Sequence, residues 1–265
     1  MDKTIKHLNH VGTQVLKTER LTLRPFTTDD AKDVFAFTSN PRVTKFLSYD
    51  PHEYLDTTVK TLRKWVDDYV MLGTYKWAIE LDGVVIGDIT VVERQDACFR
   101  CYLGWQLNDE YWNKGYMTEA AAAVRDFLFE VVGYERICAT HDVRNIGSGK
   151  VMQKIGMTLE GTWRDHSYTS DGSIADTNHW AILKKEWKTR NLKNRYAEST
   201  KSETLLIQEK HNDRPNEVVV AAVQKFADEL LALYTDDNIT DDMRCPIGVV
   251  KQNIIDVLNR TINPK

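Results

Sequence analysis

Short segments in which apolar and polar residues alternate recur up to residue 187, and this period of two predicts β-strands. We expect strands at residues 19–25, 75–81, 84–92, 99–107, 135–141, 158–168 and 174–183. Asp82-Gly83 separates two of them and is a turn signal typical of a β-hairpin. Residues 170–173 predict the turn of a second hairpin.

Between these strands, apolar residues recur every three or four positions, which predicts helices. We expect four of them, beginning near Thr27 or Thr28, near Glu53, at Glu119 and near Asn145. Gly133 and Gly156 fit the left-handed residue that follows a helix. This order favours an α+β (mixed α/β) fold, in which a strongly twisted mixed sheet carries helices on both faces.

The composition changes after Trp187, which ends the expected first domain, 1–187. Residues 188–215 are polar and charge-rich, as is typical of a linker or of an exposed helix. Residues 216–265 contain two amphipathic helical patterns that can form a hairpin. So small a hairpin cannot bury both apolar stripes by itself. We expect it to dock on the first domain or to join two copies in a homodimer, with a partner protein as the remaining alternative.

The turn 111–118 joins a strand to an alanine-rich helix. N–H groups in the first turn of a helix lack internal partners, and the helix dipole adds positive charge there. Gly115 lets a ligand approach the backbone, and Lys114 adds a mobile positive charge. The junction therefore predicts a phosphate site, with an ordinary turn and a solvated lysine as the alternative.

A second polar helix start follows strand 135–141. Asn145 or Ser148 can cap this helix, and Met152 and Ile155 lie on its inward face. The chain thus presents twice a strand that leads into a helix with a polar first turn.

Several motifs occur in a fixed order between Thr18 and Trp187. They are Thr18-Glu19-Arg20-Leu21-Thr22-Leu23-Arg24-Pro25, Leu103-Gly104-Trp105-Gln106-Leu107, Tyr111-Trp112-Asn113-Lys114-Gly115-Tyr116-Met117-Thr118-Glu119-Ala120, Asn145 with Ser148, Lys154-Ile155-Gly156-Met157, and Asp176 with Leu183-Lys184-Lys185-Glu186-Trp187. Together they resemble the GNAT superfamily of acyl-CoA N-acetyltransferases, within it the branch of the RimJ/RimL ribosomal-protein N-acetyltransferases. The resemblance implies an acetyl-CoA-dependent acyltransferase domain.

The resemblance also implies which residues hold acetyl-CoA. The family's pyrophosphate loop has the form Arg/Gln-x-x-Gly-x-Gly/Ala, and residues 112–117 lie in that register with only Gly115 matching. Met117 replaces a small residue, so we expect a displaced pyrophosphate or a methionine turned into the core. The pantetheine arm would lie in a V-shaped gap where strand 99–107 diverges from strand 135–141. The expected acetyl-CoA-binding residues are Trp105, Gln106, Leu107, Asn113, Lys114, Gly115, Tyr116, Met117, Thr118, Asn145, Ser148 and Lys154.

Acyl transfer needs a neutral amine, whereas lysine and much of the α-amino group are protonated at neutral pH. By resemblance, Ser148 is the candidate acid for the leaving thiolate, with a capping role as the alternative. Asn145 would bind the pantetheine amide or cap its helix. Many relatives carry a glutamate at the position of Tyr102, so Glu93 is the candidate base, directly or through water. Glu93 can equally be a solvated charge, and Tyr102 can line the acceptor pocket.

Further titratable side chains lie on the late strands. His141, His166 and His179 are candidates, although a histidine on a strand is more often structural. Asp176 would bind a cationic acceptor or make a structural bond. The acceptor cleft is expected to include the aromatic residues Phe46, Trp65, Trp163 and Tyr168.

Charge and composition exclude some classes of partner. A net charge of -4 and a pI near 6.0 provide no basic field for direct nucleic-acid binding. The sequence has no apolar run of membrane-spanning length, and its first ten residues lack the apolar segment of a signal peptide, so we expect a cytoplasmic protein without membrane contact. A zinc ribbon needs two Cys-x-x-Cys pairs, so we expect no metal or disulfide chemistry at the four cysteines, Cys98, Cys101, Cys138 and Cys245.

Two classes of function are compatible with these residues. The first is direct acetyl transfer from acetyl-CoA to a primary amine: a protein N-terminus such as that of a ribosomal protein, or a small amine such as a polyamine or an aminoglycoside-like drug. The second is a non-catalytic module that binds or senses acyl-CoA, which Met117 and the missing strand carboxylate favour.

Overall fold

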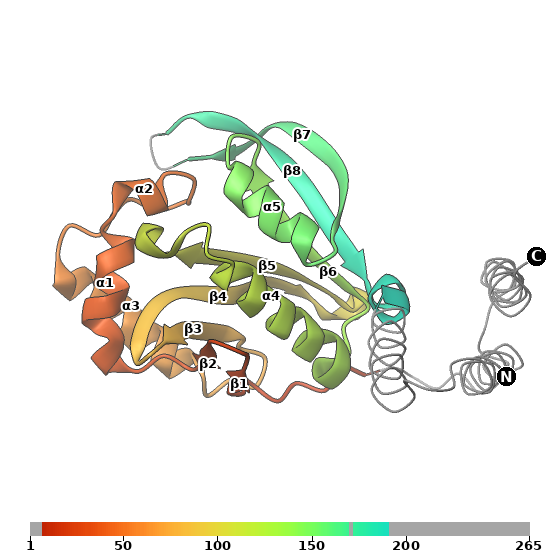
Figure 1. Cartoon of the computed structure of the whole chain (residues 1–265), viewed down its shortest axis with the longest axis horizontal. Helices are drawn as coiled ribbons and strands as arrows, with labels where there is room; N and C mark the ends of the chain where they lie inside the picture. The colour runs from red at the N-terminus through yellow and green to blue at the C-terminus, as the bar shows by residue number, and fades with distance from the viewer. Residues whose placement is uncertain (1–6, 170–171, 191–265) are drawn as a thin grey trace, which may run out of the picture. The chain divides into compact units, whose positions relative to one another are not determined.

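A computed structural model of the chain describes residues 7–169 and 172–190. Its described part is built on an eight-stranded sheet in the order β1-β2-β3-β4-β5-β6-β8-β7 (Figure 1). All neighbouring strands are antiparallel except β5 and β6, which are parallel. The strands are β1 Leu16–Lys17, β2 Thr22–Arg24, β3 Lys76–Leu81, β4 Val84–Gln95, β5 Arg100–Leu107, β6 Arg136–Asp142, β7 Thr158–Tyr168 and β8 Ile174–Leu183.

Helices pack on both faces of this sheet. Residues of α1 and α3 form one core cluster with Ala78 of β3, whereas residues of α4 form the larger cluster with Trp77 and Ile79 of the same strand. Successive strand residues point to opposite faces, so the two clusters lie on opposite sides. The helices are α1 Ala31–Thr38, α2 Pro41–Thr44, α3 Leu55–Asp68, α4 Tyr116–Phe127 and α5 Ile146–Lys154, with short 3-10 turns η1 Thr28–Asp30, η2 Asp96–Cys98 and η3 Asp109–Tyr111 and a π-helical turn η4 Leu128–Val132.

β5 and β6 are neighbours for only part of their length. Their paired residues run from Arg100 with Arg136 to Leu103 with Ala139. Beyond that point, residues 104–107 pair with β4 and residues 140–142 pair with β8. The sheet therefore opens between the carboxyl ends of β5 and β6, and the predicted V-shaped gap is present.

The strongest turn signals predicted the hairpins correctly. Asp82 has φ 50° and Gly83 has φ 83°, so both central residues of the β3–β4 turn have the positive φ that a tight hairpin turn requires. β7 and β8 begin and end at the predicted residues. The mixed sheet with helices on both faces is confirmed.

Several boundaries differ from the prediction. α4 begins at Tyr116 rather than Glu119, because Gly115 already takes the helix-preceding position with φ 86°. β2 is shorter than predicted because Thr18 accepts the N–H of Leu21 in a local turn before the strand. Helix α2 was not predicted, although Asn40 as its cap and Pro41 as its first residue are the usual signals.

The chain divides into a unit of residues 1–190 and a unit of residues 191–265. The predicted linker from residue 191 onward and the predicted hairpin 216–265 lie outside the described residues. Among the described helices, none combines the length and the apolar character needed to cross a membrane.

Candidate active site

A cleft of about 650 Å³ lies at the open end of β5. Its walls come from the end of β5, the turn into α4, the first turns of α5 and the segment that follows α1. All of the predicted acetyl-CoA-binding residues except Lys114 line it, namely Trp105, Gln106, Leu107, Asn113, Gly115, Tyr116, Met117, Thr118, Asn145, Ser148 and Lys154. The fold thus gathers in one cavity residues that two separate sequence motifs supply.

The first turn of α4 faces this cleft. The backbone N–H of Glu119 makes the first helical bond, to the carbonyl of Gly115 at 3.0 Å. The N–H groups of Tyr116, Met117 and Thr118 precede that bond, and all three residues line the cleft. An anion can therefore approach these donors. Met117 is only 6% exposed and belongs to the core, which agrees with the second of the two expectations for this residue.

Arg20 holds the turn before α4 in place. Its guanidinium donates to the carbonyl oxygen of Lys114 at 3.1 Å and to the carboxylate of Glu119 at 2.7 Å. The Thr18 hydroxyl donates to the same carboxylate at 2.6 Å. Burial alone would raise the pKa of Glu119, but these hydrogen bonds hold it below its usual value. The N-terminal motif and the turn are thus parts of one site, which spacing alone could not show because 99 residues separate Arg20 from Glu119.

The first turn of α5 forms the opposite wall. Asn145 is the N-cap, because its Oδ1 accepts the backbone N–H of Ser148 at 3.2 Å. The Ser148 side chain is half-buried and lines the cleft. Among the described residues, the Ser148 hydroxyl has no hydrogen-bond partner, so a ligand can use it both as donor and as acceptor.

Four cationic side chains line the cleft, and only Lys154 among them was predicted. Arg42 pairs with Asp109 at 2.8 Å, and Arg144 pairs with Asp142 at 2.6 Å. The other two, Lys150 and Lys154, are exposed residues one turn apart on α5. Such a wall favours an anionic ligand.

The predicted cation at position 114 lies beside the cleft rather than in its lining. The ammonium of Lys114 is 5.4 Å from the centroid of the Tyr111 ring, and Tyr111 does line the cleft. Sequence spacing could not separate Lys114 from the other cations, because side-chain direction depends on the turn around Gly115.

Comparison with known proteins decides the family. Residues 20–158, more than half of the chain, match the family model described as an acetyltransferase (GNAT) domain. The chain belongs to the GNAT acetyltransferase family. It is 31% identical over 174 residues to the uncharacterized N-acetyltransferase YnaD of Bacillus subtilis, covering 65% of this chain and 98% of that protein. It is 29% identical over 80 residues to the ribosomal protein uS5-alanine N-acetyltransferase of Escherichia coli, covering 26% of this chain and 41% of that enzyme.

Solved GNAT structures share the fold. An acetyltransferase from Bacillus anthracis superimposes with a TM-score of 0.58 at 28% identity, over 65% of this chain and 99% of that one. The microcin C7 self-immunity acetyltransferase MccE, solved in complex with acetyl-CoA and AMP, superimposes with a TM-score of 0.57 at 17% identity, over 63% of this chain and 93% of that one. This GNAT protein is therefore an acyltransferase enzyme, so the non-catalytic alternative is not retained.

Glu93, the predicted candidate for the base, and Tyr102, which was expected to line the acceptor pocket, are cross-strand partners in the β4–β5 ladder, and neither lines the cleft. Glu93 is exposed and accepts a hydrogen bond from the Gln95 amide at 2.5 Å. Tyr102 is partly buried, with the Arg100 guanidinium 5.6 Å from its ring centroid. Burial raises the pKa of Tyr102, which disfavours its anionic form. A direct contact between either side chain and a ligand in the cleft is not favoured by this arrangement.

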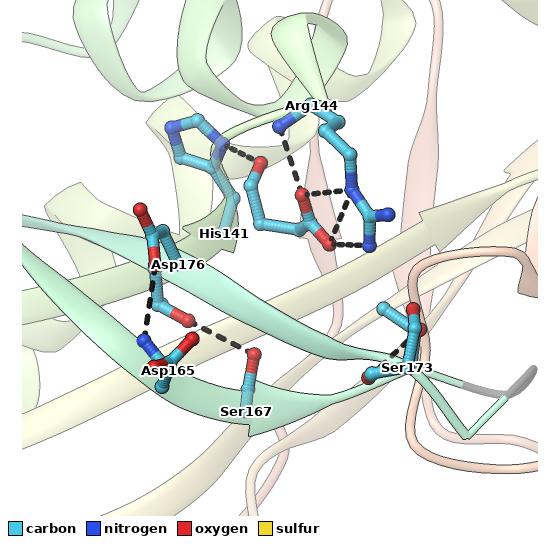
Figure 2. Close-up of polar contacts among 9 residues, drawn as sticks. His141, Arg144, Asp165, Ser167, Ser173 and Asp176 are labelled. Carbon is cyan, nitrogen blue, oxygen red and sulfur yellow. Dashed lines mark hydrogen bonds and ion pairs between the residues drawn. The ribbon is translucent and has the colours of Figure 1, made fainter.

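Two of the predicted residues of the late strands, Asp176 and His141, are held by structural bonds (Figure 2). Asp176 accepts the backbone N–H of Asp165 at 3.0 Å, and Asp165 has φ 50°. This hydrogen bond supports the structural role, which was one of the two roles expected for Asp176. His141 is 8% exposed, and its Nδ1 lies 2.8 Å from the carbonyl oxygen of Asp142, the residue that pairs with Arg144. Burial lowers the pKa of His141, so its neutral form is favoured.

The aromatic residues predicted for the acceptor cleft separate into groups. Phe46 lines the cleft. Trp65 instead packs against Phe26, with ring centroids 5.1 Å apart. Trp163 stacks on His179 at 3.8 Å on the outer hairpin, where Tyr168 is exposed. Only Phe46 of the predicted set therefore lies in the cleft lining.

Among the described residues, no cluster of three or more His, Cys, Asp or Glu side chains is suited to a metal ion. Cys98, Cys101 and Cys138 are free thiols, and Cys245 lies outside the described residues.

Proposed function

We propose that this enzyme transfers an acetyl group from acetyl-CoA directly to a primary amine. The observation that carries the proposal is the cleft itself, which combines the open end of a strand with the unpaired N–H groups of a helix start. Phosphate groups suit the helix start, and a peptide-like pantetheine arm suits the strand edge.

We propose a role for each wall of the cleft. The diphosphate of acetyl-CoA would bind the N–H groups of Tyr116, Met117 and Thr118, with Lys154 among the nearby positive charges. The pantetheine arm would lie along residues 104–107, whose edge toward β6 has no ladder partner. Asn145, as the helix cap, would contact the pantetheine amide.

The reaction then follows from these positions. The neutral amine nitrogen attacks the thioester carbonyl carbon, the C–N bond forms, and the C–S bond breaks. The leaving thiolate takes a proton from the Ser148 hydroxyl, which is available in the cleft, and water returns a proton to that hydroxyl. The amine proton goes to solvent through a water-linked base, for which Glu93 is the proposed candidate because it is exposed and lies on β4, the strand that pairs with β5. Tyr102, across from Glu93, does not line the cleft, so we propose no contact between it and the acceptor.

For the acceptor, we propose a protein N-terminus first and a small amine second. The similarity over 80 residues to the uS5-alanine N-acetyltransferase supports the first. The cleft, with Phe46 on its wall, can also hold a small amine.

The test is a steady-state assay that follows the release of free CoA thiol. The panel contains peptides with different N-terminal residues, a polyamine and an aminoglycoside. The proposal expects amine-dependent thiol release and a mass gain of one acetyl group on the product. If acetyl-CoA is bound but no amine in the panel is acetylated, direct transfer to a primary amine is wrong.

A further inference from the structure

A buried carboxylate lies behind the cleft wall. Asp88 of β4 is 4% exposed, and its cross-strand partners are Ala78 of β3 and Gln106 of β5. Ala78 belongs to the core cluster of α1 and α3, so Asp88 lies on that face of the sheet. Asp88 was not singled out in the sequence, because a lone carboxylate in an apolar strand gives no indication of its partners. Carboxylates are rarely buried in protein cores, and buried titratable groups are common at functional sites, so Asp88 is a candidate for a functional role.

Three hydrogen-bond donors or cations surround this carboxylate. The Gln106 amide nitrogen donates to Oδ2 of Asp88 at 2.5 Å, and the Thr90 hydroxyl lies 3.4 Å from Oδ1. The ammonium of Lys76 is 3.9 Å from Oδ1 and also 3.9 Å from the centroid of the Trp65 ring. Burial raises the pKa of Asp88 above its usual value, and Lys76 and the hydrogen bonds from Gln106 and Thr90 offset only part of the rise. Because these neighbours donate hydrogen bonds or carry positive charge, they stabilise the ionised carboxylate of Asp88 over its protonated form.

This carboxylate fixes the orientation of one amide side chain in the cleft wall. A carboxylate can only accept hydrogen bonds, so the nitrogen of Gln106 must face Asp88 and its oxygen must face the other way. The hydroxyl of Tyr49, from the segment after α2, donates to that oxygen at 2.5 Å. Asp88, Gln106 and Tyr49 therefore form one chain of hydrogen bonds in which each direction is determined.

The chain leaves two bonding positions on Gln106 unused. An amide nitrogen has two protons, an amide oxygen has two lone pairs, and the network takes one of each. Among the described residues, neither position has another partner, and Gln106 lines the cleft. Asp88 and Tyr49 do not line it, so they reach a ligand only through this amide.

We propose that the Gln106 side chain is the subsite for the acceptor's primary amine, and that Asp88 is a positioning residue that acts through it. This rests on the proposed function. The amide oxygen of Gln106 accepts an N–H of the amine, which leaves the nitrogen lone pair directed at the thioester carbon. As the C–N bond forms, the nitrogen gains positive charge, and the nearby negative charge of Asp88 stabilises it. No proton passes to the amide. The backbone of Gln106 remains available to acetyl-CoA.

The test is a double-mutant cycle on the full chain, using Asp88→Asn, Gln106→Leu and the double variant. Each single change is expected to lower kcat/KM for the amine on the order of tenfold, because a hydrogen bond to a charged network is lost. The double variant is expected to match Gln106→Leu, because Asp88 has no other route to the amine. The Kd of acetyl-CoA, measured by calorimetry, should stay within about twofold.

Two further variants separate this role from a purely structural one. Tyr49→Phe keeps the buried charge of Asp88 and removes only the tyrosine hydroxyl, so it should lower kcat/KM for the amine by a smaller factor. This variant should still fold even if Asp88→Asn does not. Tyr69→Phe removes a buried hydroxyl that bonds the backbone of Phe26 and Lys76 on the same face, and it should leave the amine's KM unchanged.

The failures can be told apart. If the wild type acetylates no amine, the proposed function fails and the subsite fails with it. If the wild type is active but the losses at Asp88 and Gln106 add, or if acetyl-CoA binding weakens as much as amine turnover, only the subsite is overturned.

Discussion

The two halves of β5 differ in their neighbours. Residues 100–103 pair with β4 on one side and with β6 on the other, whereas residues 104–107 pair with β4 alone. In the first half, Cys101 and Leu103 are almost completely buried. In the second half, Trp105, Gln106 and Leu107 line the cleft. A single strand therefore supplies both the rigid centre of the sheet and the ligand-binding edge, and the change occurs where β6 turns away.

The largest effect is expected in the paired half. Leu103→Ala removes a side chain that is 3% exposed, and the cavity should lower the free energy of unfolding by about 2–5 kcal/mol. Urea denaturation followed by circular dichroism measures this. Below the transition, acetyl-CoA affinity should be nearly unchanged. Val92→Ala, at a residue 64% exposed, is the control and should cost less than about 0.5 kcal/mol. If Leu103→Ala weakens acetyl-CoA binding and leaves the free energy of unfolding unchanged, the distinction between the two halves of β5 is wrong.

Ser148→Ala probes the open side and should act on turnover instead of stability. Removing the proposed acid is expected to lower kcat on the order of 10²-fold, because that is the usual contribution of a positioned proton donor. Acetyl-CoA affinity by calorimetry should change little. Ser167→Ala, which removes a hydroxyl bonded to Thr177 on the outer hairpin, is the matched control. Equal losses in kcat and affinity would assign Ser148 to the scaffold.

Charge reversals on the cleft rim should have a smaller effect. Lys154→Glu places a negative charge in the lining and should weaken acetyl-CoA binding roughly fivefold to tenfold at low salt, with less effect at high salt. Lys114→Glu, beside the lining, should weaken it less. Lys64→Glu on the exposed face of α3 is the control for net charge. If all three variants bind acetyl-CoA with the same affinity, the rim of the cleft does not bind phosphate.

The smallest effect concerns pH at the divergent end of β6. Burial lowers the pKa of His141 below 6.5, so the unfolded chain binds this proton more readily than the folded one. The resulting stability is present above the unfolded pKa and is lost as the pH falls through the folded pKa. Between about pH 7 and about pH 5, the wild type should lose more unfolding free energy than His141→Gln does. Parallel pH curves for the two proteins would contradict this.

The features that the sequence predicted correctly depend on local signals. Asp82-Gly83 predicted a hairpin because both residues accept positive φ, and alternating polarity predicted β7 and β8. The motif around Gly115 predicted a helix start and part of the cleft lining. Each of these features depends on residues that are close together in the chain.

Long-range contacts account for the parts that sequence could not predict. Glu119 holds Arg20, and Asp88 holds Gln106, through pairs that are 99 and 18 residues apart. The sequence pattern also does not predict the direction of a side chain. Lys114 lies over Tyr111 and not in the cleft lining. Glu93 and Tyr102 were chosen by position along the strands, whereas a place in the lining depends on how far the sheet has opened.

A crystal structure with acetyl-CoA tests the central claim most directly. The account predicts the pantetheine arm between residues 104–107 and 140–142, with the diphosphate at the N–H groups of residues 116–118. If acetyl-CoA lies elsewhere while this gap stays closed to it, the open end of β5 is not the donor site and the account is contradicted.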